Sequence, residues 1–203
     1  MGKTYIIADA HFCDIAAAQG QHMDVDEYNN TIIENTNKVA TPEDTIIFIG
    51  DIGSYENKDT IKDCIARLAA KTKKCIDMRL QPSFNTREKM EEIGIERAYT
   101  IDGFTKGEVY DNAYFVVITS DYNYYSQFFN SPAIDGADRY FAMPASALNR
   151  VGKEYTNLLQ DKCLNISIGA WNLYPMDYDA IITNIDNMRI FNSMEDEEHE
   201  STV

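Results

Sequence analysis

The first part of the chain alternates short apolar runs with stretches in which apolar residues recur every third or fourth position. Apolar runs at 4–8 and 45–49, rich in β-branched residues, predict buried strands, and a third strand is expected at 74–78. The intervening stretches have helical spacing, over 24–39 and around Ile61, Ile65 and Leu68. Asp24 is expected to cap the first of these helices.

The rest of the chain is predicted to be rich in strands. Asn85 should cap a helix that runs through Glu92, and Gly94 should end it. Strands are expected after this helix at 99–101, 108–110, 114–119, 139–143 and 163–168. Asp177 should cap a last short helix that carries Tyr178, Ile181 and Ile182.

The order of these elements predicts a layered α/β fold. Strands and helices alternate at first, and strands then dominate. Because no linker or repeat divides the chain, we expect a single domain over residues 1–193. Residues 194–203 are polar and acidic, and they are expected to form a disordered tail.

Polar residues directly follow two of the predicted strands. Asp9 and His11 come after the run at 4–8, and Gly50 and Asp51 come after the run at 45–49. In an α/β fold such residues collect on the edge of the sheet where ligands bind. A purely structural interpretation stays open, because Asp after a strand often caps a loop and Gly-Asp is common in turns.

Charge and composition narrow the function classes. The chain has 18 basic and 33 acidic side chains, a formal net charge of −15. Such a surface should repel nucleic acid and suits cations or a basic partner, although solubility alone also explains it. No apolar stretch reaches the roughly 18 residues of a membrane span, and we expect no signal peptide. Four widely spaced cysteines without a CxxC pair indicate free thiols in a reducing cytoplasm.

Several motifs follow one another in an informative order. Asp9-Ala10-His11-Phe12 and Gly50-Asp51 are accompanied by the stretches 26–29, 33–39, 42–45, 164–167, 170–172 and Pro175. Together they resemble the calcineurin-like metallophosphoesterases, and in particular a small branch from bacteria and phages. The resemblance covers nearly the whole chain. It implies a layered β-sandwich flanked by helices, in a protein of a bacterial cytoplasm.

The resemblance also implies a set of metal ligands, of which only part is present. In that family two divalent metals clamp the phosphate and activate a water molecule. Asp9 and His11 match ligands of the first metal, and Asp51 matches the carboxylate that bridges both metals. Gln81 stands in Leu80-Gln81-Pro82-Ser83, where the family has Gly-Asn-His-Asp. Ser120, followed by Asp121, stands where the family has a ligand histidine.

Histidine is scarce in this chain. Its three histidines are His11, His22 and His199. His22 is expected to be a solvated loop residue, and the stretch 143–147 lacks the late histidine motif of the family. We therefore expect no two-metal centre, and at most one divalent cation (Mn, Mg, Zn or Fe) at Asp9, His11 and Asp51.

Three functions remain open from the sequence. The first is a pseudoenzyme, catalytically impaired, that binds a phosphorylated ligand, a nucleotide or a protein partner. The second is an active metal-dependent phosphoesterase with a reduced, single-metal site that Asp14, Gln81 or Asp121 helps to complete. The third is an interaction protein that uses the aromatic run at 122–129, a run that ordinary packing against the sheet would also explain.

Overall fold

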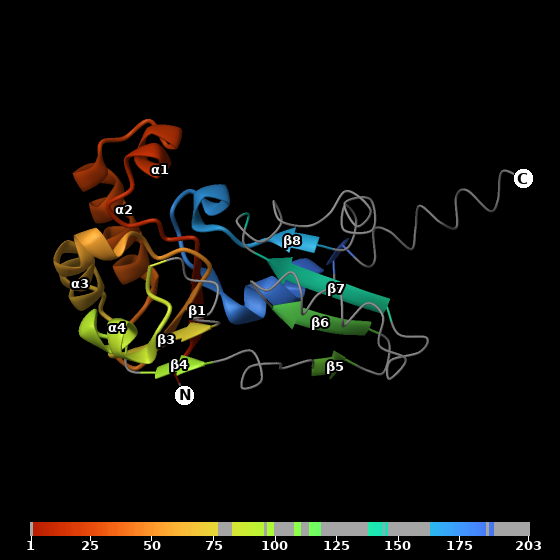
Figure 1. Ribbon diagram of the computed structural model, residues 1–203. Coiled ribbons are helices and arrows are strands. Elements are labelled where there is room, and N and C mark those ends of the chain that lie inside the picture. Colours follow the sequence, from red (N-terminus) through yellow and green to blue (C-terminus); the bar gives the residue numbers. More distant parts are fainter. Residues whose placement is uncertain are drawn as a thin grey trace, which may run out of the picture.

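We describe the protein from a computed structural model (Figure 1). The structure describes residues 2–76, 83–95, 97–99, 108–110, 114–118, 138–143, 145, 163–185 and 187–188. Several predictions concern residues outside these ranges: the candidate site residues Gln81, Ser120 and Asp121, the aromatic run at 122–129 and the tail at 194–203.

The first sheet has the strand order β4-β3-β2-β1-β9 in the described part of the chain. Its parallel strands are β1 (Thr4–Ala8), β2 (Thr45–Ile49), β3 (Thr72–Ile76) and β4 (Arg97–Tyr99). The short β9 (Met176–Asp177) runs antiparallel to β1. In the central register Tyr5 lies opposite Ile46, so the carboxyl ends of β1 and β2 coincide.

The second sheet has the order β5-β6-β7-β8. Its strands are β5 (Glu108–Tyr110), β6 (Tyr114–Ile118), β7 (Asp138–Met143) and β8 (Cys163–Asn165). β5 and β6 are antiparallel, whereas β6, β7 and β8 run parallel to one another.

Helices cover the first sheet on the side away from the second sheet (Figure 1). They are α1 (Ile15–Gly20), α2 (Val25–Val39), α3 (Lys58–Ala66) and α4 (Arg87–Glu92), with a short 3-10 helix η1 (Tyr55–Asn57) before α3. Residues 178–185 are also helical and follow the 3-10 helix η5 (Ile168–Trp171) and β9. The coarse prediction of an α/β fold with stacked layers is therefore confirmed.

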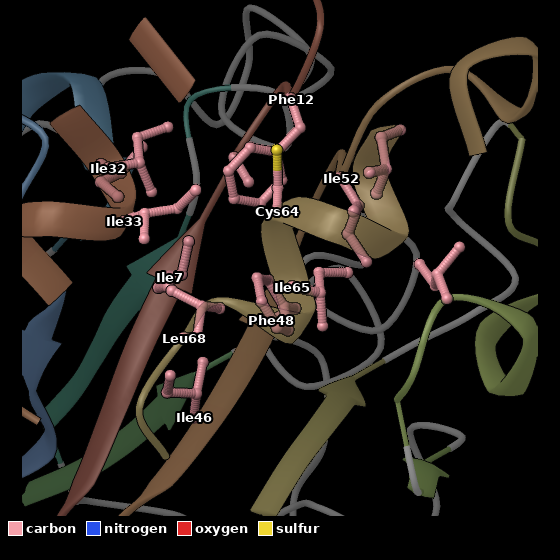
Figure 2. Close-up of a cluster of buried hydrophobic side chains, with 14 of the residues drawn as sticks. Ile7, Phe12, Ile32, Ile33, Ile46, Phe48, Ile52, Cys64, Ile65 and Leu68 are labelled. Atoms are coloured by element: carbon pink, nitrogen blue, oxygen red, sulfur yellow. The ribbon is translucent and has the colours of Figure 1, made fainter. Parts of the chain in front are cut away.

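Side chains that alternate between the two faces of β1 and β2 form two buried hydrophobic clusters. Ile7, Ile46 and Phe48 point to the helices and join a buried cluster with residues of α2 and α3, such as Ile32 and Ile65 (Figure 2). Their neighbours Ile6, Ala8, Ile47 and Ile49 point the other way and pack with Ala142 of β7 and with Ile181 and Ile185. Because successive side chains of a strand face opposite sides, β1 and β2 are buried on both faces.

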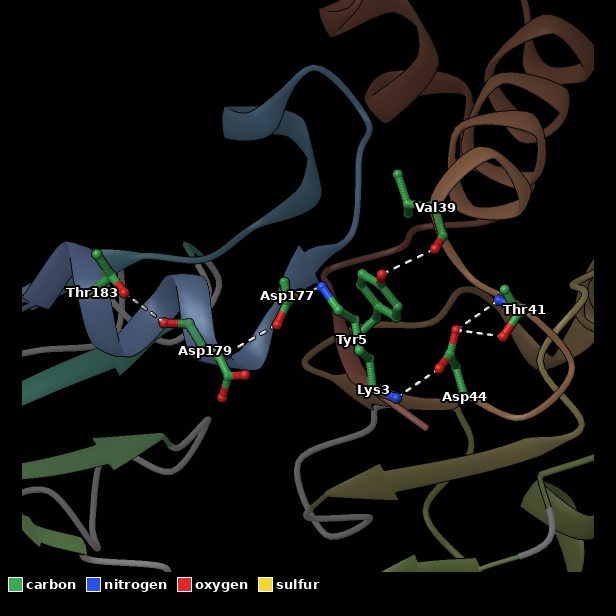
Figure 3. Close-up of polar contacts among 8 residues, drawn as sticks. All are labelled: Lys3, Tyr5, Val39, Thr41, Asp44, Asp177, Asp179 and Thr183. Atoms are coloured by element: carbon green, nitrogen blue, oxygen red, sulfur yellow. Dashed lines mark hydrogen bonds and ion pairs between the residues drawn. The ribbon is translucent and has the colours of Figure 1, made fainter. Parts of the chain in front are cut away.

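Polar contacts fix the amino-terminal end of β1 (Figure 3). The Asp44 carboxylate accepts hydrogen bonds from the Lys3 N–H at 2.6 Å and from the N–H and hydroxyl of Thr41 at 2.7 and 2.8 Å. The Tyr5 hydroxyl donates to the Val39 carbonyl at 2.9 Å, and Lys3 Nζ lies 2.7 Å from Asp177 Oδ2. These contacts place β1 against the end of α2 and against β9.

Most predicted elements are present, with some shifts at their ends. β3 (Thr72–Ile76) begins two residues before the predicted 74, and β4 (Arg97–Tyr99) begins two residues before the predicted 99, while the predicted positions 77–78 and 100–101 lie outside the described residues. The cap of α4 is Thr86, whose hydroxyl accepts from the Lys89 N–H, and Asn85 instead accepts from Lys89 Nζ. β8 stops at Asn165, short of the predicted 168, because the Asn165 side chain accepts from the Ser167 N–H and turns the chain.

Other local predictions are confirmed. Asp24 caps α2 by accepting from the Glu27 N–H at 2.8 Å. Asp177 accepts from the Asp179 N–H at 3.0 Å at the start of helix 178–185. Gly94 has a φ of 87° just after α4, a backbone angle that suits glycine. All four cysteines lie in described stretches, and each is a free thiol.

Candidate functional site

The loop after β1 has an unusual backbone. Asp9, His11 and Cys13 have φ values of 53°, 46° and 64°, in the left-handed region that residues with a side chain seldom adopt. Backbone hydrogen bonds to the loop after β2 hold this conformation: Asp9 N to Ile49 O, His11 N to Asp51 O and Phe12 N to Ile52 O, at 2.8–3.1 Å. The parallel pairing of β1 and β2 thus continues into both loops. Strained backbone of this kind tends to occur at functional sites.

Close packing between these two loops requires glycine at position 53. Its φ is 142°, and a Cβ built there would lie 2.5 Å from the Phe12 carbonyl oxygen. Phe12 itself is fully buried in the helix-side cluster. The two loops are therefore fixed to the core as well as to each other.

The Asp9 carboxylate lies buried at the centre of this arrangement, with the residue only 6% exposed. Its Oδ1 accepts from the Asp51 N–H at 3.2 Å, and its Oδ2 accepts from the Ser167 hydroxyl at 2.8 Å. The Ser167 hydroxyl in turn accepts from the Ala145 N–H at 2.6 Å. Asp9 therefore bonds to the loop after β2 and to the segment after β8.

His11 lies nearer the surface, between two carboxylates. Its Nδ1 is 3.6 Å from Asp14 Oδ2 and 3.8 Å from Asp51 Oδ2. The His11 side chain is 31% exposed, and those of Asp14 and Asp51 are 40% and 28% exposed. We call Asp9, His11, Asp14 and Asp51 together the carboxylate edge.

Two of these carboxylates also satisfy nearby backbone groups. Asp14 Oδ1 caps α1 by accepting from the N–H groups of Ala16 and Ala17 at 2.7 and 3.0 Å. Asp51 Oδ1 accepts from the Gly53 N–H at 2.9 Å. Each therefore has one oxygen committed to a turn, while the other lies near His11.

Side chains of α2 support the loop from behind. The buried Tyr28 hydroxyl donates to the Ala10 carbonyl at 3.1 Å, and burial, followed by the charges of Asp14 and Asp9, raises the pKa of Tyr28 to about 12. Asn29 Oδ1 accepts from the Cys13 N–H at 3.0 Å. Burial raises the pKa of the Cys13 thiol, which disfavours its thiolate. The neutral Tyr28 therefore remains a hydrogen-bond donor.

The structure brings together the three predicted ligands Asp9, His11 and Asp51, as their positions after adjacent parallel strands indicated. It adds Asp14 on the surface side and Ser167 on the buried side. Sequence reasoning gave Ser167 no role, although it lies in the closing segment 164–167 that carries part of the family resemblance. His22 is exposed and has a φ of 60°, which agrees with its prediction as a solvated loop residue.

The described residues do not fit the two-metal centre of the resembled family. Among them, no three His, Cys, Asp or Glu side chains converge as ligands of one ion. Both Asp9 oxygens accept hydrogen bonds from protein groups, and Ala145, within the stretch 143–147, directs its N–H at Ser167. Asp9, which the resemblance assigns to the first metal, is therefore engaged in contacts within the chain.

Comparison with known proteins shows a similarity of structure. No protein-family model matches the chain, and no curated protein matches it. Among solved structures, it is similar to the crystal structure of a protein of unknown function from Aquifex aeolicus. The TM-score is 0.58 at 14% sequence identity, over 91% of this chain and 100% of the other. At this identity the similarity concerns the fold alone.

Within the described part of the chain, every helix is too short or too polar to cross a lipid bilayer.

Proposed function

We propose that the chain is a metallophosphoesterase-like protein that has lost two-metal catalysis and acts by binding at the carboxylate edge. The observation that carries the proposal is that both carboxylate oxygens of Asp9 accept hydrogen bonds from this chain. The donors are the Ser167 hydroxyl and the Asp51 N–H, so the buried carboxylate is engaged in holding the loops. A side chain in that position is poorly placed to exchange ligands during turnover.

The electrostatics of the edge favour one class of occupant. A phosphorylated ligand or a nucleotide would meet the partly exposed carboxylates of Asp14 and Asp51 within a chain of net charge −15. Like charges at such short range repel, unless a cation lies between them. A basic side chain of a protein partner meets no such repulsion. Of the three occupants that the sequence left open, the protein partner is therefore the one we favour.

The proposal predicts the absence of turnover. Wild-type protein with manganese present should not hydrolyse phosphomonoesters, phosphodiesters or cyclic nucleotides above the buffer rate. Asp51→Asn serves as the control, because it removes the carboxylate charge at the position that matches the metal-bridging residue of the resembled family. Metal-dependent hydrolysis that disappears in Asp51→Asn would refute the proposal.

Binding can be tested with a hexa-arginine peptide and with ADP, each at physiological ionic strength. We expect the peptide to bind, and Asp14→Asn and Asp51→Asn each to weaken it by up to about fivefold, as for partly exposed ion pairs. The matched control is Asp63→Asn, an exposed change of the same kind on α3. Equal weakening by all three variants, or tighter binding of ADP without metal, would argue against a basic partner at this edge.

A single-metal phosphoesterase remains the second candidate, because one observation favours it. His11 Nδ1 lies within 4 Å of the Asp14 and Asp51 carboxylates on the accessible side of the edge. Hard divalent cations accept carboxylate and water oxygens. Because no three such side chains of the described residues converge on one ion, this candidate requires His11, Asp14 and Asp51 to move closer together when a cation binds. Calorimetric titration with manganese alone separates the candidates: this one requires binding that His11→Ala and Asp51→Asn both abolish.

A further inference from the structure

Asp9 and Ser167 connect parts of the chain that belong to different sheets. Asp9 follows β1 of the first sheet, and Ser167 follows β8 of the second sheet. Ser167 also forms an isolated parallel bridge with Ala8, the last residue of β1. The contact between the two side chains therefore lies where the two sheets meet.

The directions of the hydrogen bonds are fixed by chemistry. A backbone N–H can only donate, so Ser167 Oγ accepts from Ala145 N at 2.6 Å. The single hydroxyl proton of Ser167 then points to Asp9 Oδ2, which is 2.8 Å away. Asp9 Oδ1 accepts from Asp51 N. Two side chains thereby join four segments: the ends of β1 and β2, the residues after β7 and those after β8.

Burial makes these contacts energetically important. Asp9 is 6% exposed and Ser167 is 7% exposed. A buried carboxylate is tolerated only when hydrogen bonds compensate its lost hydration. A bond from a hydroxyl to an ionised acceptor is stronger than one between neutral groups. Removing either side chain would leave the other buried without one of its hydrogen bonds, which costs free energy.

We propose that Asp9 and Ser167 form a structural latch that joins the two sheets, and that Asp9 performs this role in place of ligating a metal. The latch requires no occupant at the carboxylate edge, because Asp51, Ser167 and Ala145, which make its hydrogen bonds, belong to this chain. It is therefore independent of whether a protein partner binds there. The latch also gives Ser167 a specific role, because its hydroxyl supplies to Asp9 Oδ2 the compensation that a cation would otherwise supply.

The test is a double-mutant cycle on the full chain in the presence of a chelator. The variants are Asp9→Asn, Ser167→Ala and the two combined. Asparagine keeps the shape of Asp9 but places an NH2 group where one carboxylate oxygen stood, so one of the two donors, the Asp51 N–H or the Ser167 hydroxyl, then faces another donor. Asp63→Asn is the control for loss of one negative charge.

We expect each single change to raise the unfolding equilibrium constant by about tenfold or more, as for a lost bond to a charged group. The combined variant should be little worse than the less stable single variant, because both changes break the same contact. Asp63→Asn should unfold as the wild type does. Additive effects, or an Asp9→Asn variant as stable as the wild type without metal, would overturn the latch.

Manganese alone supplies a second measurement. If Asp9 acts as a latch, the thermal unfolding midpoint of the wild type should be the same with manganese as with a chelator. A rise in that midpoint that is absent in Asp9→Asn would identify Asp9 as a ligand and overturn the proposal. If Asp9→Asn does not fold, Ser167→Ala still tests the latch, because it removes the hydroxyl donor and keeps the Asp9 carboxylate. A Ser167→Ala urea midpoint equal to that of the wild type would then contradict the latch.

Discussion

Single carboxylates hold the loops of this protein by accepting more than one hydrogen bond at once. Asp44 does so at the amino-terminal end of β1, and Asp9 does so at the carboxyl end. In both cases a carboxylate near the end of a strand accepts a hydrogen bond from a backbone N–H that lies beyond the pairing of the sheet. The aspartates near the strand ends thus have structural roles whether or not the carboxylate edge binds a ligand.

Asp44 should make part of the stability depend on pH. Hydrogen bonds from the Thr41 N–H, the Lys3 N–H and the Thr41 hydroxyl lower the pKa of Asp44 below its ordinary value. A lowered pKa in the folded state gives stability above the unfolded pKa of about 3.9, and that stability is lost as the pH falls through the folded pKa. We expect Asp44→Asn to unfold at lower urea than the wild type at pH 7, and the difference to shrink below pH 4. A difference independent of pH would contradict this assignment.

Tyr28 offers a second prediction for a single side chain. Tyr28→Phe removes the donor to the Ala10 carbonyl while keeping the ring, and we expect a loss of about 1 to 2 kcal/mol in the free energy of unfolding. Urea denaturation measures it. Tyr174→Phe, on an exposed tyrosine, is the matched control and should change stability little. Equal effects of the two changes would show that the Ala10 contact contributes nothing.

At the level of elements, the first sheet depends on apolar side chains of both faces. Phe48 in β2 is fully buried against α2 and α3, where the alternation of the strand places it (Figure 2). Helical spacing in 24–39 supplies Ile32 and Ile33 to the same cluster. The apolar residues at strand spacing and those at helix spacing thus pack in the same cluster, which makes this layer predictable from sequence.

Phe48→Ala should be among the most damaging changes in this layer. We expect a loss of about 3 to 5 kcal/mol, because the transfer free energy of the ring is lost and a cavity remains. Phe48→Leu should cost less and should remain folded for measurement. Val39→Ala, at a site that is 38% exposed, is the control. Similar urea midpoints for Phe48→Ala and Val39→Ala would refute the assignment of Phe48 to the core.

At the level of the whole molecule, the two sheets should unfold together. Ile6, Ile47 and Ala142 belong to one buried cluster that contains both sheets, and the Asp9–Ser167 latch lies beside it. Shared burial of this extent favours a single cooperative transition.

The single tryptophan of the chain can report on this coupling. Trp171 follows Ser167 in the connecting segment, and its Nε1 donates to the Asn165 carbonyl at 2.8 Å. We expect urea transitions followed by tryptophan fluorescence and by far-ultraviolet circular dichroism to coincide. A fluorescence transition at clearly lower urea would show that the junction of the sheets opens before the strands unfold.

The sequence by itself determined the layer of β1, β2, α2 and α3, the caps Asp24 and Asp177, and the meeting of Asp9, His11 and Asp51. These features depend on local periodicity, on cap chemistry and on the rule that parallel strands end at one edge. Element ends such as Thr86 and Asn165 were less predictable, because neighbouring residues compete for the same role as a cap or a turn.

Only the tertiary structure decided what the Asp9 carboxylate does. A sequence motif specifies a side chain and its approximate position, and it does not specify which distant groups donate to that side chain. Ser167, which accepts from the Ala145 N–H, reaches Asp9 because the second sheet folds back onto the end of β1. Hydrogen bonds between residues so far apart in the sequence arise from the packing of the two sheets, which no local pattern encodes.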